Sequence, residues 1–281
     1  MAIHFQRPVL STHPIRCRLA TRSWHLTRRW LSNSYSHSKR AGEFAALLLL
    51  IGSTNASMAD STADSAVTLR PYIAQYMTTT RGMDLALTRQ LKQGADGSYT
   101  LTNGGKIMVV GFHEVSVFDV EGDRIVPRSY VYQGTGLINR RREVHFTPGS
   151  PIVRSLYKEQ WYDLPRSQKT LDRMSQQEQL RLRLLNDPTP RGDIAVQIAD
   201  GKRVKDYTLV FVGEELVQTP LGAVKSLHFT RIHDDPERKS DIWLAPDWDY
   251  LMVKTLHVED ESPVEITLTS ATIEGQPVAP L

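Results

Sequence analysis

Alternating apolar and polar residues fill most of the chain after residue 71. Such alternation predicts strands with one buried face, and turn-forming residues separate neighbouring segments. We therefore expect a mainly β protein, an antiparallel curved sheet or half-open β-barrel. The predicted strands span 72–80, 83–93, 98–103, 106–120, 124–134, 137–147, 193–200, 204–215, 222–233, 240–246, 250–259 and 264–275.

Glycine stands at three places where a tight hairpin needs a positive φ: Asp96-Gly97, Asn103-Gly104 and Glu121-Gly122-Asp123. Consecutive strands are therefore expected to be neighbours in the sheet. In the predicted strand "DYTLVFVG", residues 206–213, both faces are largely apolar. This pattern predicts a strand that is buried on both sides or lines a closed interior.

One segment has a helical period. Its apolar residues recur at spacings of three and four, Ser175 and Glu178 fit a capping box, and Pro188 ends the segment. We predict one α-helix over about 171–186 that covers one end of the β framework. A helix that binds a partner is the alternative.

The N-terminal segment differs from the rest. Every Lys, Arg, Asp or Glu before Glu43 is basic, an apolar stretch follows over residues 44–52, and Ser57 and Ala59 suit a signal peptidase. We predict a signal peptide over residues 1–59 cleaved after Ala59, a flexible linker over 60–70, a single β-rich domain over 71–281 and a periplasmic location. A mitochondrial transit peptide and a misassigned start codon remain alternatives, because the basic region is unusually long.

Removal of this leader changes the net charge and the cysteine content of the remaining chain. The 281-residue chain has a net charge of +3, but its basic excess lies in the leader, so the remainder is mildly acidic. Nucleic acid is therefore not an expected partner, because phosphate neutralisation supplies most of that affinity. The single cysteine, Cys17, also lies in the leader. The apolar stretch is too short to span a membrane, so the cleaved protein is not expected to be membrane-spanning.

Motifs that carry catalysis or bind cofactors do not occur in the sequence. His113-Glu114 lacks the second histidine of a zinc site, and there is no serine-hydrolase elbow, phosphate loop or dinucleotide fingerprint. We predict no cofactor and no metal, and we assign no catalytic residue. The consecutive Arg140, Arg141 and Arg142 are expected on a solvated edge strand, with an anionic group as the alternative ligand.

Aromatic residues gather in "SDIWLAPDWDYLMVKTLHVED", residues 240–260. The simplest interpretation is a hairpin whose aromatics close one end of the β framework. The alternative is a ligand-binding wall. Its candidate residues are Trp161, His228, Trp243, Trp248 and Tyr250.

The segments "IWLAPDWDYLMVKTLHVE", "ELVQTPLGAVKSLHFTR" and "SYTLTN…GFHEVSVF…RIVPRSY" resemble an uncharacterised exported bacterial family, domain of unknown function 3108. The likeness extends from about Pro71 to Ile273. Family members commonly have proline where this chain has Met252. The resemblance implies a secreted, mostly β protein of unknown activity and supplies no catalytic residues.

Three functional hypotheses follow. The first is a non-enzymatic envelope protein that holds a lipid, another apolar or amphipathic ligand, or a partner's extended segment in the concave face of the sheet. The second is an envelope-polymer hydrolase that uses His113 and Glu114, or His228. The third is a structural scaffold whose edge strand pairs with another envelope protein.

Overall fold

A computed structural model of the chain describes residues 67–80, 83–107, 109–137, 139–189, 192–233, 237–259 and 262–280. These residues belong to one unit of the chain, Ser61–Leu281. The predicted signal peptide and residues 60–66 of the predicted linker lie outside the described residues.

The described residues form sixteen strands, one α-helix and one short 3-10 helix. The first eight strands are β1 (Tyr72–Thr80), β2 (Met83–Gln93), β3 (Tyr99–Ile107), β4 (Val110–Glu121), β5 (Arg124–Thr135), β6 (Arg141–Phe146), β7 (Ile152–Tyr157) and β8 (Gln160–Pro165). The remaining elements are β9 (Thr170–Leu171), α1 (Ser175–Asn186), β10 (Ile194–Asp200), β11 (Arg203–Thr219), β12 (Gly222–Ile232), β13 (Lys239–Ala245), η1 (Pro246–Trp248), β14 (Leu251–Glu259), β15 (Ser262–Ile273) and β16 (Gln276–Pro277).

All strands belong to one sheet, ordered β8-β7-β6-β5-β4-β3-β2-β1-β15-β14-β13-β12-β11-β10-β9, with β16 added beside β15. Most neighbours in the sheet are also neighbours in sequence and pair antiparallel, as hairpin connections require. The pair of β1 with β15 joins the two halves of the sheet, and among the described strands only β9 pairs in parallel, with β10. The predicted fold class, a curved antiparallel sheet with one helix, is confirmed.

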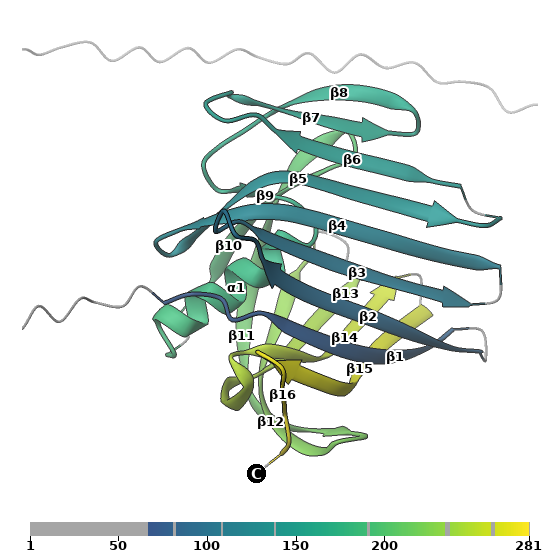
Figure 1. Cartoon of the computed structure of the whole chain (residues 1–281), viewed down its shortest axis with the longest axis vertical. Helices are drawn as coiled ribbons and strands as arrows, with labels where there is room; N and C mark the ends of the chain where they lie inside the picture. Colours follow the sequence, from purple (N-terminus) through teal and green to yellow (C-terminus); the bar gives the residue numbers. More distant parts are fainter. Residues whose placement is uncertain are drawn as a thin grey trace, which may run out of the picture. The chain divides into compact units, whose positions relative to one another are not determined.

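The sheet curls so that its two halves face each other, with α1 at one end of strands β1–β5 (Figure 1). We call the side that carries Tyr76, Phe229 and Ile242 the inner face, and the opposite side the outer face. Side chains alternate between these faces along each strand. Inner-face residues such as Tyr76 and Phe229 are almost completely buried.

The far ends of the curled sheet meet through side chains rather than through backbone pairing. Arg142 Nη1 on β6 lies 3.5 Å from Asp200 Oδ1 at the end of β10. The next residue, Gly201, packs against the ring of Tyr157 on β7, and Lys202 Nζ lies 5.7 Å from the ring centre of Tyr162 on β8. The turn between β10 and β11 therefore docks on strands β6–β8 and closes the curl.

Helix α1 begins at Ser175, four residues later than predicted. Asp172 explains the difference, because its Oδ1 accepts hydrogen bonds from the backbone N–H groups of Met174 (2.8 Å) and Ser175 (2.9 Å). The Ser175 hydroxyl in turn accepts from the Asp172 N–H. The predicted capping role of Glu178 is therefore wrong; this residue is buried and contacts two arginines instead.

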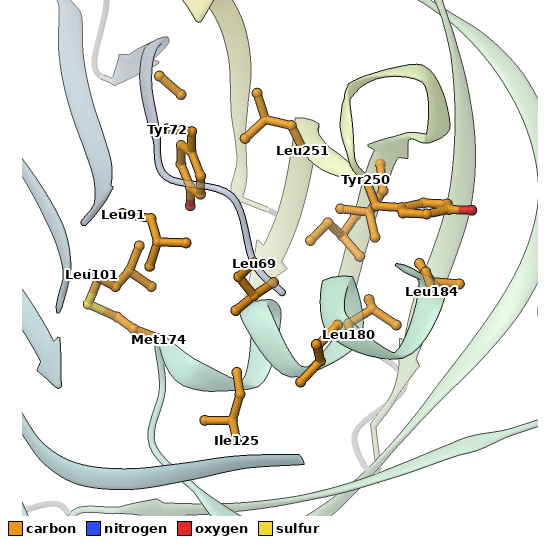
Figure 2. Packing of buried hydrophobic residues seen from close by; sticks show 14 of the residues in the cluster. Leu69, Tyr72, Leu91, Leu101, Ile125, Met174, Leu180, Leu184, Tyr250 and Leu251 are labelled. Atoms are coloured by element: carbon orange, nitrogen blue, oxygen red, sulfur yellow. The ribbon is translucent and has the colours of Figure 1, made fainter. Parts of the chain in front are cut away.

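Helix α1 fills the end of the curl at which it lies. Leu180 and Leu184 are at most 3 % exposed and share one apolar cluster with Leu69, Tyr250 and Leu251 (Figure 2). Burying side chains of this size contributes about 1.5–3 kcal/mol each. This end of the interior is therefore packed core.

Within the described residues, no helix has the length and apolarity that crossing a membrane requires.

Three predictions about individual strands are wrong. Asn103 and Gly104 lie inside β3 rather than in a hairpin turn. Of the two options predicted for β11, burial on both faces is wrong, because Val212 on its outer face is 53 % exposed; the option that it lines the interior stays open, since Tyr207 and Phe211 pack against the core. The arginines at 140–142 do not lie on an edge strand, because β6 pairs with β5 on one side and β7 on the other.

Candidate functional site

Away from α1, the inner face keeps large apolar side chains that are only partly buried. They come from both halves of the sheet and pack against the buried core: Leu85 (β2), Phe112 (β4), Tyr132 (β5), Tyr207 and Phe211 (β11) and Ile266 (β15). The rings of Phe112 and Tyr132 stack with centroids 6.2 Å apart. Phe211 packs on the buried ring of Phe229, with centroids 5.4 Å apart. This part of the inner face offers apolar surface that the protein itself does not cover.

Polar groups lie on the same face beside these apolar residues. Glu114 on β4 accepts hydrogen bonds from the Tyr130 hydroxyl (2.6 Å) and from the Asn103 side-chain amide (3.0 Å). Burial and the Glu114 carboxylate raise the pKa of Tyr130, so its hydroxyl stays protonated and donates.

Arginines meet at the seam between the halves. Asp200 is shared by Arg142 and by Arg173, whose Nη1 lies 3.3 Å from Asp200 Oδ2. Arg231 on β12 lies with its guanidinium carbon 4.6 Å from the centre of the Tyr207 ring. The partly buried inner face therefore combines apolar side chains with a group of cations.

Comparison with known proteins identifies the family. Residues 72–269 match a family model described as a protein of unknown function, DUF3108. The chain belongs to this family. A comparison with curated proteins finds no match for this DUF3108 member.

A solved structure similar to this DUF3108 member is titled a beta-barrel-like protein of the domain of unknown function DUF1849, from Brucella abortus. The two chains are 11 % identical, with a TM-score of 0.48. The match covers 74 % of this chain and 99 % of the other.

Trp161, one of the candidate lining residues, does not lie on the inner face. It is 42 % exposed on the outer face of β8, near His145 (ring centroids 5.6 Å apart) and with the Arg154 guanidinium 4.9 Å from its ring centre. The reason is strand alternation: Trp161 pairs with Leu156, whereas the inner face of β8 carries Tyr162 and Leu164.

His228 and Trp243 are brought together, but on the outer face. Their rings stack with centroids 4.3 Å apart. The Glu215 carboxylate accepts a hydrogen bond from the Trp243 indole N–H at Oε2 (2.8 Å), and its Oε1 lies 2.7 Å from His228 Nδ1. Lys254 lies over the other side of Trp243 and pairs with Glu265 at 2.8 Å. These five side chains form one row across β11–β15.

Asp241 borders this row and is fully buried. Its carboxylate lies 3.4 Å from His228 Nε2 and 3.1 Å from Lys239 Nζ. An imidazole between two carboxylates is held in a fixed orientation, as acid–base chemistry requires. The same contacts also serve to fix one strand against the next.

Trp248 and Tyr250 belong to the packed end of the molecule. Both are at most 7 % exposed, and the Trp248 indole N–H donates to the Ala279 carbonyl at 3.3 Å. Arg181 of α1 donates to the Asp249 carbonyl between them, at 2.8 Å. These two aromatics therefore stabilise the contact between η1, α1 and the C-terminal residues.

His113 and Glu114 lie on opposite faces, because they are adjacent in a strand. Glu114 lies on the inner face, whereas exposed His113 borders a depression of about 550 Å³ that is also lined by Thr88, Gly104, Thr135 and Phe112. The two side chains therefore cannot act on one substrate. Across the described ranges, no group of three or more His, Cys, Asp or Glu residues is arranged to hold a metal ion.

Sequence reasoning missed the residues that shape the inner face. A usable indication was present in β12, where Leu227, Phe229 and Arg231 share one face by alternation. An arginine in register with two buried apolar residues has to reach solvent, a carboxylate or a ligand.

Proposed function

We propose that the protein is exported to the periplasm and binds an amphipathic ligand on the inner face of its curled sheet, without catalysing a reaction. The observation that supports this proposal is the contrast between the two ends of the inner face. The α1 end is filled by buried leucines and aromatics, whereas the other end leaves Phe112, Tyr132 and Phe211 half-buried. Apolar side chains with a few polar groups beside them are typical of small-molecule sites.

The chemistry of this surface favours a ligand with both an apolar and a polar part. A purely apolar ligand would leave Arg142, Asp200 and Arg231 near its surface without solvent, which costs free energy. A purely polar ligand would gain nothing from Phe112 and Phe211. An amphipathic molecule satisfies both kinds of group.

Lipid extraction tests the proposal. The full chain, expressed with its own leader and purified without detergent from the periplasm, should yield a co-purifying amphiphile by mass spectrometry. Phe211→Asp should lose that material. Val212→Asp is the matched control, because the neighbouring residue points to the outer face and is already 53 % exposed.

Two results would contradict this function. One is a protein that carries no amphiphile and binds none when it is added. The other is equal loss in Phe211→Asp and Val212→Asp, with both variants folded by circular dichroism. N-terminal sequencing of the purified protein tests export separately, and we expect the mature chain to begin at Asp60.

The hydrolase alternative now depends on His228, because its contacts with Glu215 and Asp241 orient the imidazole. His228→Gln and Trp243→Phe both disturb the outer-face row, but only the first removes an acid–base group. Loss of growth under envelope stress in His228→Gln alone would favour catalysis over ligand binding.

A further inference from the structure

Arg231 lies on the inner face and has no carboxylate partner among the residues that the structure describes. It extends from β12 opposite Leu209, a buried residue of β11, and is itself half-buried. Its charged group lies against the ring of Tyr207, 4.6 Å from the ring centre. Among the described residues, no Asp or Glu lies within ion-pairing distance of it.

The groups around Arg231 increase the local positive charge. Burial lowers the pKa of Arg231, Tyr207 raises it, and the nearby cation Arg173 lowers it again by repulsion. Arg173 and Arg142 share a single carboxylate, that of Asp200, at 3.3 and 3.5 Å. Among the described residues, Arg142 and Arg173 therefore share the Asp200 carboxylate, and Arg231 lies close enough to Arg173 for their charges to repel.

A second carboxylate in the neighbourhood is already occupied. Glu114 attracts Arg173 electrostatically without forming an ion pair with it. Its two carboxylate oxygens accept hydrogen bonds from the Tyr130 hydroxyl and the Asn103 side-chain amide. A buried or half-buried arginine without a counter-ion is unfavourable for the folded chain by itself. An anion that pairs with Arg231 and Arg173 would remove this cost.

We propose that Arg231, together with Arg173, forms a binding site for the anionic headgroup of an amphiphile, a phosphate or a carboxylate. Guanidinium groups suit such groups because their paired N–H donors match two oxygens of an oxyanion. Half-buried Phe211 lies two residues from Leu209 on the inner face of β11 and presents an apolar surface for the tail. This inference rests on the proposed function and specifies the chemical class of its ligand.

Binding of three probes tests the site in the purified full chain: dodecyl phosphate, the uncharged dodecyl maltoside, and inorganic phosphate. Affinities are measured by calorimetry below the micellar concentrations. The key variant is Arg231→Gln. Arg231→Lys keeps the positive charge but lacks the paired, coplanar N–H donors of the guanidinium group. Lys225→Gln is the matched control, since it removes a cation from the same strand, where Lys225 is 57 % exposed and pairs with Glu214.

We expect dodecyl phosphate to bind more tightly than dodecyl maltoside. Arg231→Gln should weaken dodecyl phosphate roughly ten- to a hundredfold, the usual effect of losing a hydrogen bond to a charged group. Arg231→Lys should give an intermediate loss. The affinity for dodecyl maltoside should be unchanged in both Arg231 variants. Lys225→Gln should bind dodecyl phosphate as tightly as the wild type does.

The outcomes separate this inference from the proposed function. Equal affinity of wild type and Arg231→Gln for dodecyl phosphate would refute the anion site and leave amphiphile binding intact. Arg231-dependent binding of inorganic phosphate without binding of either amphiphile would keep the anion site and refute the amphipathic ligand. No binding of any probe would refute both.

Thermal unfolding without ligand distinguishes a binding role from a structural role. If Arg231 serves the ligand, Arg231→Gln should change the unfolding temperature of the ligand-free protein little, because losing the contact with the Tyr207 ring and relieving the repulsion from Arg173 act in opposite directions. A clear drop in the unfolding temperature would assign Arg231 to the stability of the fold and contradict the proposal.

Discussion

Glu178 of α1 forms a buried ion cluster with Arg181 and Arg89, and Glu178→Gln tests its energetics. The carboxylate is 1 % exposed, and its partners Arg181 and Arg89 are 3 % and 7 % exposed. Glu178 accepts a hydrogen bond from the Tyr72 hydroxyl at 2.8 Å and one from Arg181 at 2.8 Å, with Arg89 at 3.4 Å. The variant keeps the volume and removes the charge.

The expected loss of unfolding free energy follows from the two arginines that remain buried in Glu178→Gln. Two buried guanidinium groups lose the carboxylate that they share, and removing one partner of a buried ion pair typically costs about 3–5 kcal/mol. A domain has a total stability of about 5–15 kcal/mol, so the loss is a large fraction. Urea unfolding followed by circular dichroism measures it.

Glu121→Gln is the control for the loss of a carboxylate. Glu121 pairs with Arg124 at 2.9 Å, but its side chain is 59 % exposed. Exposed pairs contribute about 0–1 kcal/mol, so the midpoint of this variant should barely move. If Glu178→Gln also loses less than about 1 kcal/mol, the cluster is not the energetic centre of the α1 end, and the reasoning is refuted.

Three further predictions concern pH and two individual contacts. Burial opposes ionisation of Glu178, but Arg181 and Arg89 outweigh it and lower its pKa below the ordinary 4.5. The stability difference between wild type and Glu178→Gln should therefore be constant above the ordinary pKa and shrink as pH falls through the folded pKa; a difference independent of pH down to 2 would contradict this. Asp172→Ala removes the acceptor at the start of α1 and should cost about 1–3 kcal/mol by urea unfolding, whereas no change would exclude a capping role. Trp243→Phe keeps an aromatic ring but loses the indole N–H and part of the buried ring volume, so it should cost at least about 0.5–1.5 kcal/mol of unfolding free energy, and an unchanged urea midpoint would mean that the hydrogen bond to Glu215 contributes nothing.

Alternation predicted most strands because a half-buried strand has a period of two. Strands β7 and β8 escaped this reasoning for a specific reason. The turn of their hairpin is formed by Lys158 and Glu159, which have positive φ angles of 50° and 64° although neither residue is glycine. A turn of this kind usually requires glycine or asparagine, so the sequence contained no sign of it.

The candidate site was less predictable than the fold. The contact between Arg142 and Asp200 joins residues that lie far apart in the chain, and it exists only because the curled sheet brings β6 beside the end of β10. Local patterns carry no information on this closure. Aromatic clustering instead pointed to Trp243, Trp248 and Tyr250, which pack against the protein's own side chains.

The central claim is that the inner face binds an amphiphile, and a crystal structure of the full chain with dodecyl phosphate tests it most directly. The account predicts an alkyl chain against Tyr132 and Phe211, with phosphate oxygens within hydrogen-bonding distance of Arg231. Density for the ligand beside His228 on the outer face, or in the depression at His113, would contradict it. So would a ligand-free inner face at saturating dodecyl phosphate.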